Sequence, residues 1–424
     1  MSSSVRGDEL FPALPFFTAN DPELVRATAV RDPLGLLPVW SGVGRELVPH
    51  LASGVYKLSG IKAVLLIHWL LQEPLKEVAS RNFRACFRLL EGLLEYYLWA
   101  HANAGQCFGT RALSRPDGFR VFAHDAGTAV NGLYQYYSGT CRRAELVDAE
   151  WTVLPDVATA FRRCWSTSAV NALRHGLERV LDDIDRQAFE PKQVLDGTQV
   201  LARAIGEAFD STALMTVMRD RVLGNAAQVA FARHCADIRQ QASGQPKVDQ
   251  MVDNLALRLR DDREPASALR PSLTRVSECE HFLVLVQDAF DLMRALERNS
   301  LGQAAKWMEP SRAVHRDRAQ RFAGLYAANA GERDEQIAAL ANALTSGPTE
   351  SFLQEVINHH QRLMKERGSE PLLSIDEGKI VSLLGAERSL ITVQDHMKRG
   401  LPWNNGYYLA TAGAIHSQLF GTRT

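Results

Sequence analysis

Residues 105–165 read GQCFGTRALSRPDGFRVFAHDAGTAVNGLYQYYSGTCRRAELVDAEWTVLPDVATAFRRCW, and no other part of the chain mixes aromatic, glycine and arginine residues so densely. The middle of this stretch predicts a helix that carries three tyrosines, Tyr134, Tyr136 and Tyr137. The Ser-Gly-Thr sequence at 138–140 predicts a break after this helix, because glycine flanked by small hydroxyl residues is typical of a turn.

The second half of the stretch has the order of elements found in a winged-helix module. Arg142 and Arg143 form a short basic turn, a strand is expected over Trp151–Leu154, and a helix opens at Pro155. Winged-helix units place one helix in a nucleic-acid groove and often set a β-hairpin against the backbone. The sequence therefore predicts a winged-helix-like element over 105–165.

The arginines and tyrosines of this element supply groups that bind nucleic acid, since guanidinium groups bind phosphates and aromatic rings stack on bases. The predicted nucleic-acid-binding residues are Arg111, Arg115, Arg120, Tyr134, Tyr137, Arg142 and Arg143. The alternative is structural. In that interpretation the tyrosine helix packs into a core through Leu133, Tyr136 and Tyr137, and the arginines pair with Glu145, Asp148 and Glu150.

The composition is that of an ordinary globular protein. The chain has 424 residues, of which 46% are hydrophobic and 23% are charged, and its formal net charge is −1. This length is enough for two or three domains with sizeable cores. The near-zero charge excludes a polycationic protein of the histone type, so any nucleic-acid surface must be a local patch.

The cysteines and the hydropathy favour a reduced, cytoplasmic protein without a membrane partner. The six cysteines are scattered and form no Cys-x-x-Cys pair, which argues against a structural zinc site and a disulfide framework. The N-terminal residues lack the basic start and apolar core of a signal peptide. The most apolar run, residues 61–71, is about half the length that a membrane span needs.

Hydrophobic periodicity predicts a mainly α fold. Helices are expected at about 60–72, 76–102, 273–299, 311–330, 332–345 and 349–367. The segment SEPLLSIDEGKIVSLLG, at 369–385, turns at Asp376-Glu377-Gly378 and predicts a small C-terminal β-hairpin. The expected divisions are an N-terminal helical segment (1–104), the winged-helix-like element (105–165), a helical segment (166–245) and a C-terminal helical domain (246–424).

Two short motifs suggest metal chemistry, and each has a simpler interpretation. His359 and His360 are adjacent on a helix, where side chains diverge by about 100°, so they do not form an i, i+4 chelating pair. A Glu-x-Lys at Glu377 and Lys379, with Asp376, resembles half of a restriction-type nuclease site. That site needs a mixed sheet and an earlier carboxylate, whereas a hairpin turn explains the same residues.

Nucleophilic catalysis finds no support in the sequence, which has no Gly-x-Ser-x-Gly elbow and no cysteine in a recognisable nucleophile context. We therefore predict no catalytic residue, no metal site and no cofactor, and we favour a protein that is not an enzyme.

Three segments resemble a group of uncharacterised bacterial proteins encoded in defence or mobile islands. The segments are PVWSGVGRELVPHL (Pro38–Leu51), GLYQYYSGTCRRAELVD (Gly132–Asp148) and HHQRLMKERGSEPLLSID (His359–Asp376). Those proteins combine an N-terminal helical segment, a winged-helix-like insertion and a helical C-terminal half. The resemblance implies a DNA-associated component of a multi-gene system, and it names no catalytic residue.

These observations predict a non-enzymatic nucleic-acid-binding or scaffold component of a bacterial multi-protein system, such as one for anti-phage defence. Its expected partners are double-stranded DNA and other protein subunits. Two alternatives remain open at this stage. One is a protein-protein interaction scaffold without nucleic acid, and the other is a metal-dependent nuclease that uses the C-terminal carboxylates.

Overall fold

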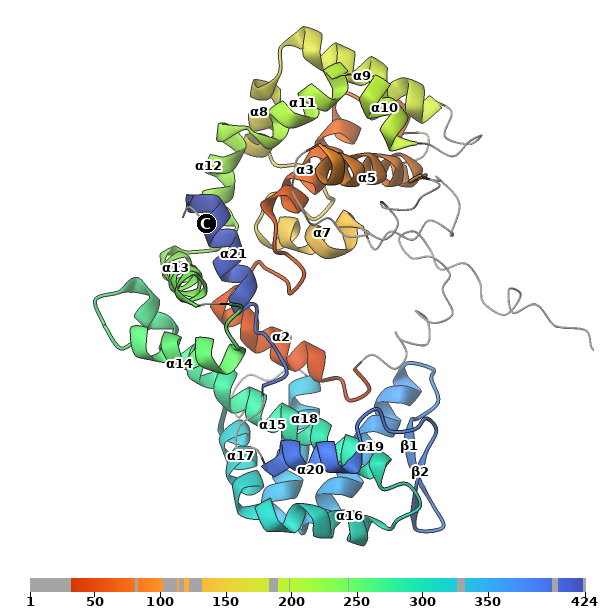
Figure 1. Ribbon diagram of the computed structural model, residues 1–424, viewed down its shortest axis with the longest axis vertical. Coiled ribbons are helices and arrows are strands. Elements are labelled where there is room, and N and C mark those ends of the chain that lie inside the picture. The colour runs from red at the N-terminus through yellow and green to blue at the C-terminus, as the bar shows by residue number, and fades with distance from the viewer. Residues whose placement is uncertain are drawn as a thin grey trace, which may run out of the picture. The chain divides into compact units, whose positions relative to one another are not determined.

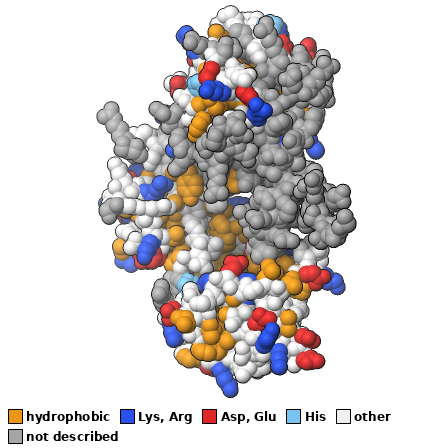
Figure 2. Space-filling view, turned by 45° about the vertical axis from the view of Figure 1, so that its right-hand side comes forward, with side chains coloured by type: hydrophobic (Ala, Val, Ile, Leu, Met, Phe, Trp, Pro, Cys, Tyr) orange, Lys and Arg blue, Asp and Glu red, His pale blue; other side chains and the backbone are white. Residues whose placement is uncertain are grey.

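The chain is mainly helical, as predicted, with one small antiparallel sheet near its C-terminus among the described residues (Figure 1). The computed structural model describes residues 32–80, 83–101, 113, 118–121, 132–182, 190–197, 199–242, 244–325, 332–398 and 403–421. No helix in these ranges has the length and apolar character needed to cross a bilayer. On the surface, described acidic and basic side chains are interspersed, in keeping with the net charge of −1 (Figure 2).

The chain forms two compact units, and each is built from segments that are far apart in the sequence. Of the described residues, those within 48–240 and 410–421 form the first unit, and those within 32–47 and 241–409 form the second. The change of unit near residue 240 lies close to the division expected at 245 from the linker-like sequence there. The N-terminal and C-terminal segments cross this division, which local sequence composition does not reveal.

The first unit is organised around helix α3 (Leu58–Gln72), which is buried on almost every side. Its sequence is apolar all round, as expected for a core helix. It contacts α5 (Phe83–Ala100) and α7 (Leu133–Arg143). Gly60 makes the contact with α7 possible, because a Cβ atom there would lie 2.3 Å from the ring of Tyr137. The other helices of this unit are α4 (Lys76–Ala79), α8 (Pro155–Cys164), α9 (Thr167–Asp182), α10 (Pro191–Gly197), α11 (Gln199–Phe209), α12 (Thr212–Arg221), α13 (Ala226–Gln241) and α21 (Leu409–Phe420).

The second unit is organised around α15 (Arg270–Ala295), which contacts α2, α17, α19 and α20. The helices predicted at about 273–299, 311–330, 332–345 and 349–367 correspond to α15, α17, α18 and α19, whereas α14, α16 and α20 were not predicted. The other elements are α2 (Leu36–Leu47), α14 (Val248–Arg258), the 3₁₀ helices η2 (Pro265–Leu269) and η3 (Glu309–Ser311), α16 (Leu301–Met308), α17 (Arg312–Leu325), α18 (Glu332–Ser346), α19 (Thr349–Glu366) and α20 (Leu390–Lys398).

The predicted C-terminal hairpin is present in the second unit. Strand β1 (Leu373–Asp376) pairs with β2 (Lys379–Ser382), and Asp376 lies opposite Lys379. Glu377 and Gly378 form the two-residue turn, with φ values of 47° and 76°. Positive φ at both positions is the requirement of a type I′ hairpin turn, which explains the glycine.

The winged-helix-like element is not confirmed. Helix α7 continues through the expected break at 138–140 and ends only at Arg143, because tertiary packing outweighs the modest cost of one helical glycine. The expected strand Trp151–Leu154 is absent, and the described residues there form only an isolated bridge between Val147 and Val153. A wing is a β-hairpin of two paired strands, and one isolated bridge does not form such a hairpin.

Candidate functional site

The first unit contains a cavity of about 400 Å³ whose walls are largely aromatic. Its volume lies in the lower part of the range of about 300–1,000 Å³ that is typical of ligand sites. We call this cavity the aromatic pocket. Its lining residues come from α3, α5, α7 and the turn before α8, and they are His68, Gln72, Phe83, Arg84, Phe87, Tyr134, Glu150 and Trp151.

Trp151 lies at the tip of a tight turn and has an unusual backbone conformation. Its φ is +64°, in the left-handed region that favours glycine. Asp148 holds the turn, since its carbonyl oxygen accepts from the Trp151 amide at 3.2 Å and its carboxylate accepts from the Thr152 amide at 2.7 Å. A bulky residue in this conformation costs about 1–3 kcal/mol, and such residues cluster at functional sites.

Gln72, at the end of α3, fixes the same turn from the other side. Its side-chain amide donates to the Trp151 carbonyl at 2.7 Å, and its side-chain oxygen accepts from the Val153 amide at 3.0 Å. Within the turn, the Asp148 amide donates to the Thr152 carbonyl and the Leu154 amide donates to the Leu146 carbonyl, so the groups that Gln72 binds lie on the outer edge of this short bridge. The two Gln72 bonds hold the Trp151 backbone in place over the pocket.

The aromatic walls contact one another as well as the cavity. The Trp151 indole stacks on the His68 ring at 5.7 Å with only 9° between the planes, and lies 5.6 Å from the Tyr134 ring. Tyr134 in turn meets Phe87 edge to face at 5.3 Å. Phe83 closes the wall and remains 41% exposed. The pocket thus offers preformed flat surfaces to a planar ligand.

His68 is the buried polar group in this wall. The residue is 1% exposed, and neither ring nitrogen has a hydrogen-bond partner among the described residues. Burial lowers the pKa of His68 to about 4, so the ring is neutral at physiological pH. A neutral imidazole has one donor and one acceptor. Because both nitrogens are buried, His68 contributes its ring to the aromatic wall and presents no hydrogen-bonding group to the cavity.

Two glutamates of α5 position the helix that carries Tyr134. The carboxylate of Glu91 accepts from the Tyr134 amide at 2.8 Å, and that of Glu95 accepts from the Leu133 amide at 3.2 Å. They satisfy amides that the first turn of α7 leaves without helical partners. Burial raises the pKa of Glu91 to about 7, and burial together with the charge of Glu91 raises the pKa of Glu95.

Charged side chains stand at the rim of the pocket. The Arg142 guanidinium lies 5.6 Å from the centre of the Trp151 ring, within the range of a cation–π contact. Arg84 and Glu150 line the cavity, whereas Arg142 is not part of the lining and contacts only its Trp151 wall; all three side chains are exposed. Two cations and one anion therefore lie at or near the stacking surfaces.

The structure separates the seven residues predicted to bind nucleic acid. Tyr134 and Arg142 come together at the aromatic pocket. Tyr137 is 2% exposed and packs against α3, as the core-packing alternative predicts. Arg143 is half-buried and donates to the carbonyl oxygens of His50 and Leu51 at 3.1–3.4 Å.

Three further arginines were predicted. Arg120 is exposed and forms an ion pair with Glu190 at 3.0 Å. Arg111 and Arg115 lie outside the described residues. Sequence reasoning missed His68, Phe83 and Trp151 as parts of one site. The only signal was a histidine inside the most apolar run of the chain, at 61–71.

The two metal-like motifs belong to the second unit and have structural roles there. His359 bonds to the Leu34 carbonyl oxygen at 2.7 Å, and His360 bonds to the Pro33 carbonyl oxygen and accepts from the Leu372 amide, each at 2.8 Å. Both histidines are buried rather than on the helix surface. No cluster of three or more His, Cys, Asp and Glu side chains able to hold a metal was found in the described ranges.

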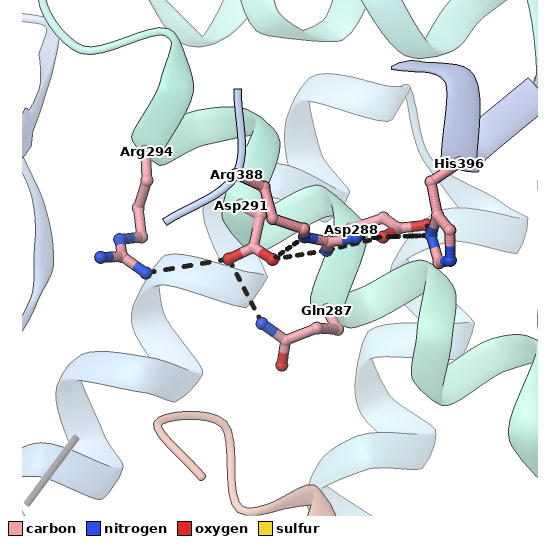
Figure 3. A network of polar contacts seen from close by, with 6 residues as sticks. All are labelled: Gln287, Asp288, Asp291, Arg294, Arg388 and His396. Carbon is pink, nitrogen blue, oxygen red and sulfur yellow. Dashed lines mark hydrogen bonds and ion pairs between the residues drawn. The ribbon is translucent and has the colours of Figure 1, made fainter. Parts of the chain in front are cut away.

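The second unit also contains a buried network of charges (Figure 3). Arg388 donates to Asp288 at 2.8 Å and to Asp291 through its Nε at 2.8 Å, and His396 bonds to Asp288 at 2.8 Å. Asp288 and Asp291 lie on α15, whereas Arg388 and His396 lie just before and within α20. The network therefore ties α20 to α15.

No known family model, curated protein or solved structure matches the chain significantly. The pocket and its residues are accordingly interpreted from their geometry.

Proposed function

We propose that the chain binds nucleic acid, without catalysing a reaction, as one component of a bacterial multi-protein system such as one for anti-phage defence. The observation that supports this proposal is that Arg84 lines the aromatic pocket and Arg142 contacts Trp151, one of its walls. Arginines bind the phosphate backbone, and aromatic rings stack on bases without strong sequence preference.

Arg142 is the residue on which to test this proposal. It is exposed, whereas the neighbouring Arg143 holds the segment at His50 and Leu51. The single change Arg142→Glu therefore alters the surface charge without breaking these backbone contacts. Surface substitutions of this kind usually change the stability by no more than about 0.5 kcal/mol.

The experiment is fluorescence anisotropy with labelled single-stranded and duplex DNA from low to moderate salt. The proposal predicts binding that weakens steeply with salt. Arg142→Glu is expected to weaken it at least fivefold, and Glu150→Gln to strengthen it. Arg203→Glu is the matched control, because the Arg203 side chain is 83% exposed and pairs with Glu207 away from the pocket lining. No binding of either DNA at low salt contradicts the proposal.

A protein-interaction scaffold is the second candidate function. Four apolar side chains of the second unit are unusually exposed within the segment 381–391: Val381 (39%), Leu383 (60%), Leu384 (48%) and Ile391 (71%). Clustered exposed apolar residues are typical of protein-binding surfaces. If this is the main function, Leu384→Glu with Ile391→Glu abolishes co-purification with co-expressed products of neighbouring genes, and Arg142→Glu leaves it unchanged.

A further inference from the structure

The aromatic pocket has features that a flat phosphate-binding surface does not need. It is a cavity of about 400 Å³, not a groove that follows a backbone. Trp151, Tyr134 and Phe87 form its stacking walls. A ligand that fits such walls is flat, and the cavity size suits a single ring system better than an extended chain.

The polar side chains of the pocket wall do not offer a hydrogen-bonding edge to a ligand. The two ring nitrogens of His68 are buried, and its ring is stacked against Trp151. The amide of Gln72 is already used by the backbone at Trp151 and Val153. The walls therefore suit a ring that is held by stacking, which tolerates any base.

The rim indicates what is attached to the planar ligand. Arg142 contacts Trp151, one wall of the pocket, and Arg84 is part of the lining. Guanidinium groups next to stacking surfaces suit a base that carries phosphate on its sugar. Glu150 repels phosphate, so the backbone is expected along the arginine side of the rim.

We propose that the aromatic pocket takes one unpaired nucleobase of a DNA strand, stacked on the aromatic walls. This inference rests on the proposed nucleic-acid binding and specifies the form that it takes. Because a paired base must first be unstacked and unpaired, single-stranded DNA is expected to bind more tightly than the same sequence in a duplex.

The test uses the full chain and two modified strands. The first is a labelled 12-mer single strand in which the central base is 2-aminopurine, whose fluorescence falls when it stacks on an aromatic ring. The second is a strand of about the same length in which every position is abasic, so that no base is available to the pocket. We expect quenching of 2-aminopurine on binding, and at least fivefold tighter binding of the intact single strand than of the duplex or the abasic strand.

Two variants separate the pocket from the rim. Phe83→Ala removes a partly exposed wall without disturbing the core, and Trp151→Gly removes the opposite ring at a backbone position that suits glycine. Each is expected to lose most of the preference for the intact strand while retaining the salt dependence set by the arginines. Melting temperatures identify any variant that fails to fold, and Phe83→Ala then carries the test.

The outcomes distinguish this inference from the proposed function. Equal affinity for intact, abasic and duplex DNA, with the Arg142→Glu effect still present, overturns the pocket assignment and leaves nucleic-acid binding intact. No binding of any DNA overturns both. Titration with deoxynucleoside monophosphates tests whether the pocket binds a free nucleotide instead of a base within a strand. If they bind as tightly as the strand, and Phe83→Ala abolishes this binding, the assignment to a strand is overturned in favour of a free nucleotide.

Discussion

Each unit of this protein buries a pair of carboxylates on a long helix, and the two pairs bind different kinds of partner. In the second unit, Asp288 and Asp291 are held by Arg388, and His396 completes the contacts of Asp288 (Figure 3). In the first unit, Glu91 and Glu95 accept from backbone amides at the start of α7. Arg88 also lowers the pKa of Glu91, but its effect is smaller than those of burial and of the Tyr134 amide.

The aspartate pair of the second unit holds two helices together, whereas the glutamate pair of the first unit positions Tyr134 in the pocket wall. Burial raises the pKa of Asp288, and His396 and Arg388 oppose that rise, so the pair in the second unit is compensated by specific cations. The glutamates of the first unit retain a strong preference for the protonated form, because burial is opposed mainly by backbone amides. They lie behind Tyr134, and their protonation therefore bears on the aromatic pocket.

The largest expected effect is the loss of the cation in the second unit. Arg388→Ala leaves Asp288 and Asp291, which are 2% and 9% exposed, without their main cation. Removing one partner of a buried ion pair typically costs about 3–5 kcal/mol. Urea denaturation is expected to show a loss of this size in the unfolding free energy. Arg321→Ala, which breaks exposed pairs with Glu278 and Asp317, is the control and should change little. Equal stability of the two variants would show that Arg388 does not stabilise the contact between α20 and α15.

A smaller effect, dependent on pH, is expected for Glu91→Gln. The pKa of Glu91 is raised by burial to about 7 from an ordinary value of 4.5, so the folded state binds more protons between these pH values. Stability is therefore fully present below about pH 4.5 and falls as the pH rises towards 7. The glutamine variant cannot titrate and still offers an oxygen to the Tyr134 amide. We expect it to gain stability over the wild type between pH 5 and 8, on the order of 3 kcal/mol.

Thermal or urea melts at pH 5, 6, 7 and 8 measure this difference. Glu77→Gln, at an exposed position on α4, is the matched control and should follow the wild type at every pH. If the Glu91→Gln variant differs from the wild type by the same amount at all four pH values, Glu91 does not titrate in this range.

The periodicity of the sequence predicts much of the helical framework, because long amphipathic or fully apolar segments have few alternatives to a helix. The hairpin at 373–382 was also predictable, since Glu377-Gly378 supplies the two positive φ values that its turn requires. The winged-helix prediction failed at Trp151. Its left-handed backbone depends on Gln72, a residue 79 positions earlier, and no local pattern reveals such a contact.

The candidate site was only partly predictable for the same reason. Tyr134 and Arg142 were identified because they lie in one dense stretch, but the opposite wall comes from α3 and α5. Tyr137 and Arg143 have the same residue types and the same sequence neighbourhood. Their burial against α3 and the 50–51 segment separates them from Tyr134 and Arg142, and this depends on tertiary packing.

The central claim is that Trp151 is kept in a strained backbone conformation because its ring forms the wall of a base-binding pocket. Trp151→Gly tests it directly, since glycine suits φ of +64° without strain and removes the ring. We predict that the relief of strain offsets much of the lost packing, so that the melting temperature changes little, while affinity for single-stranded DNA falls at least tenfold. Unchanged DNA affinity in a folded Trp151→Gly variant would contradict the account.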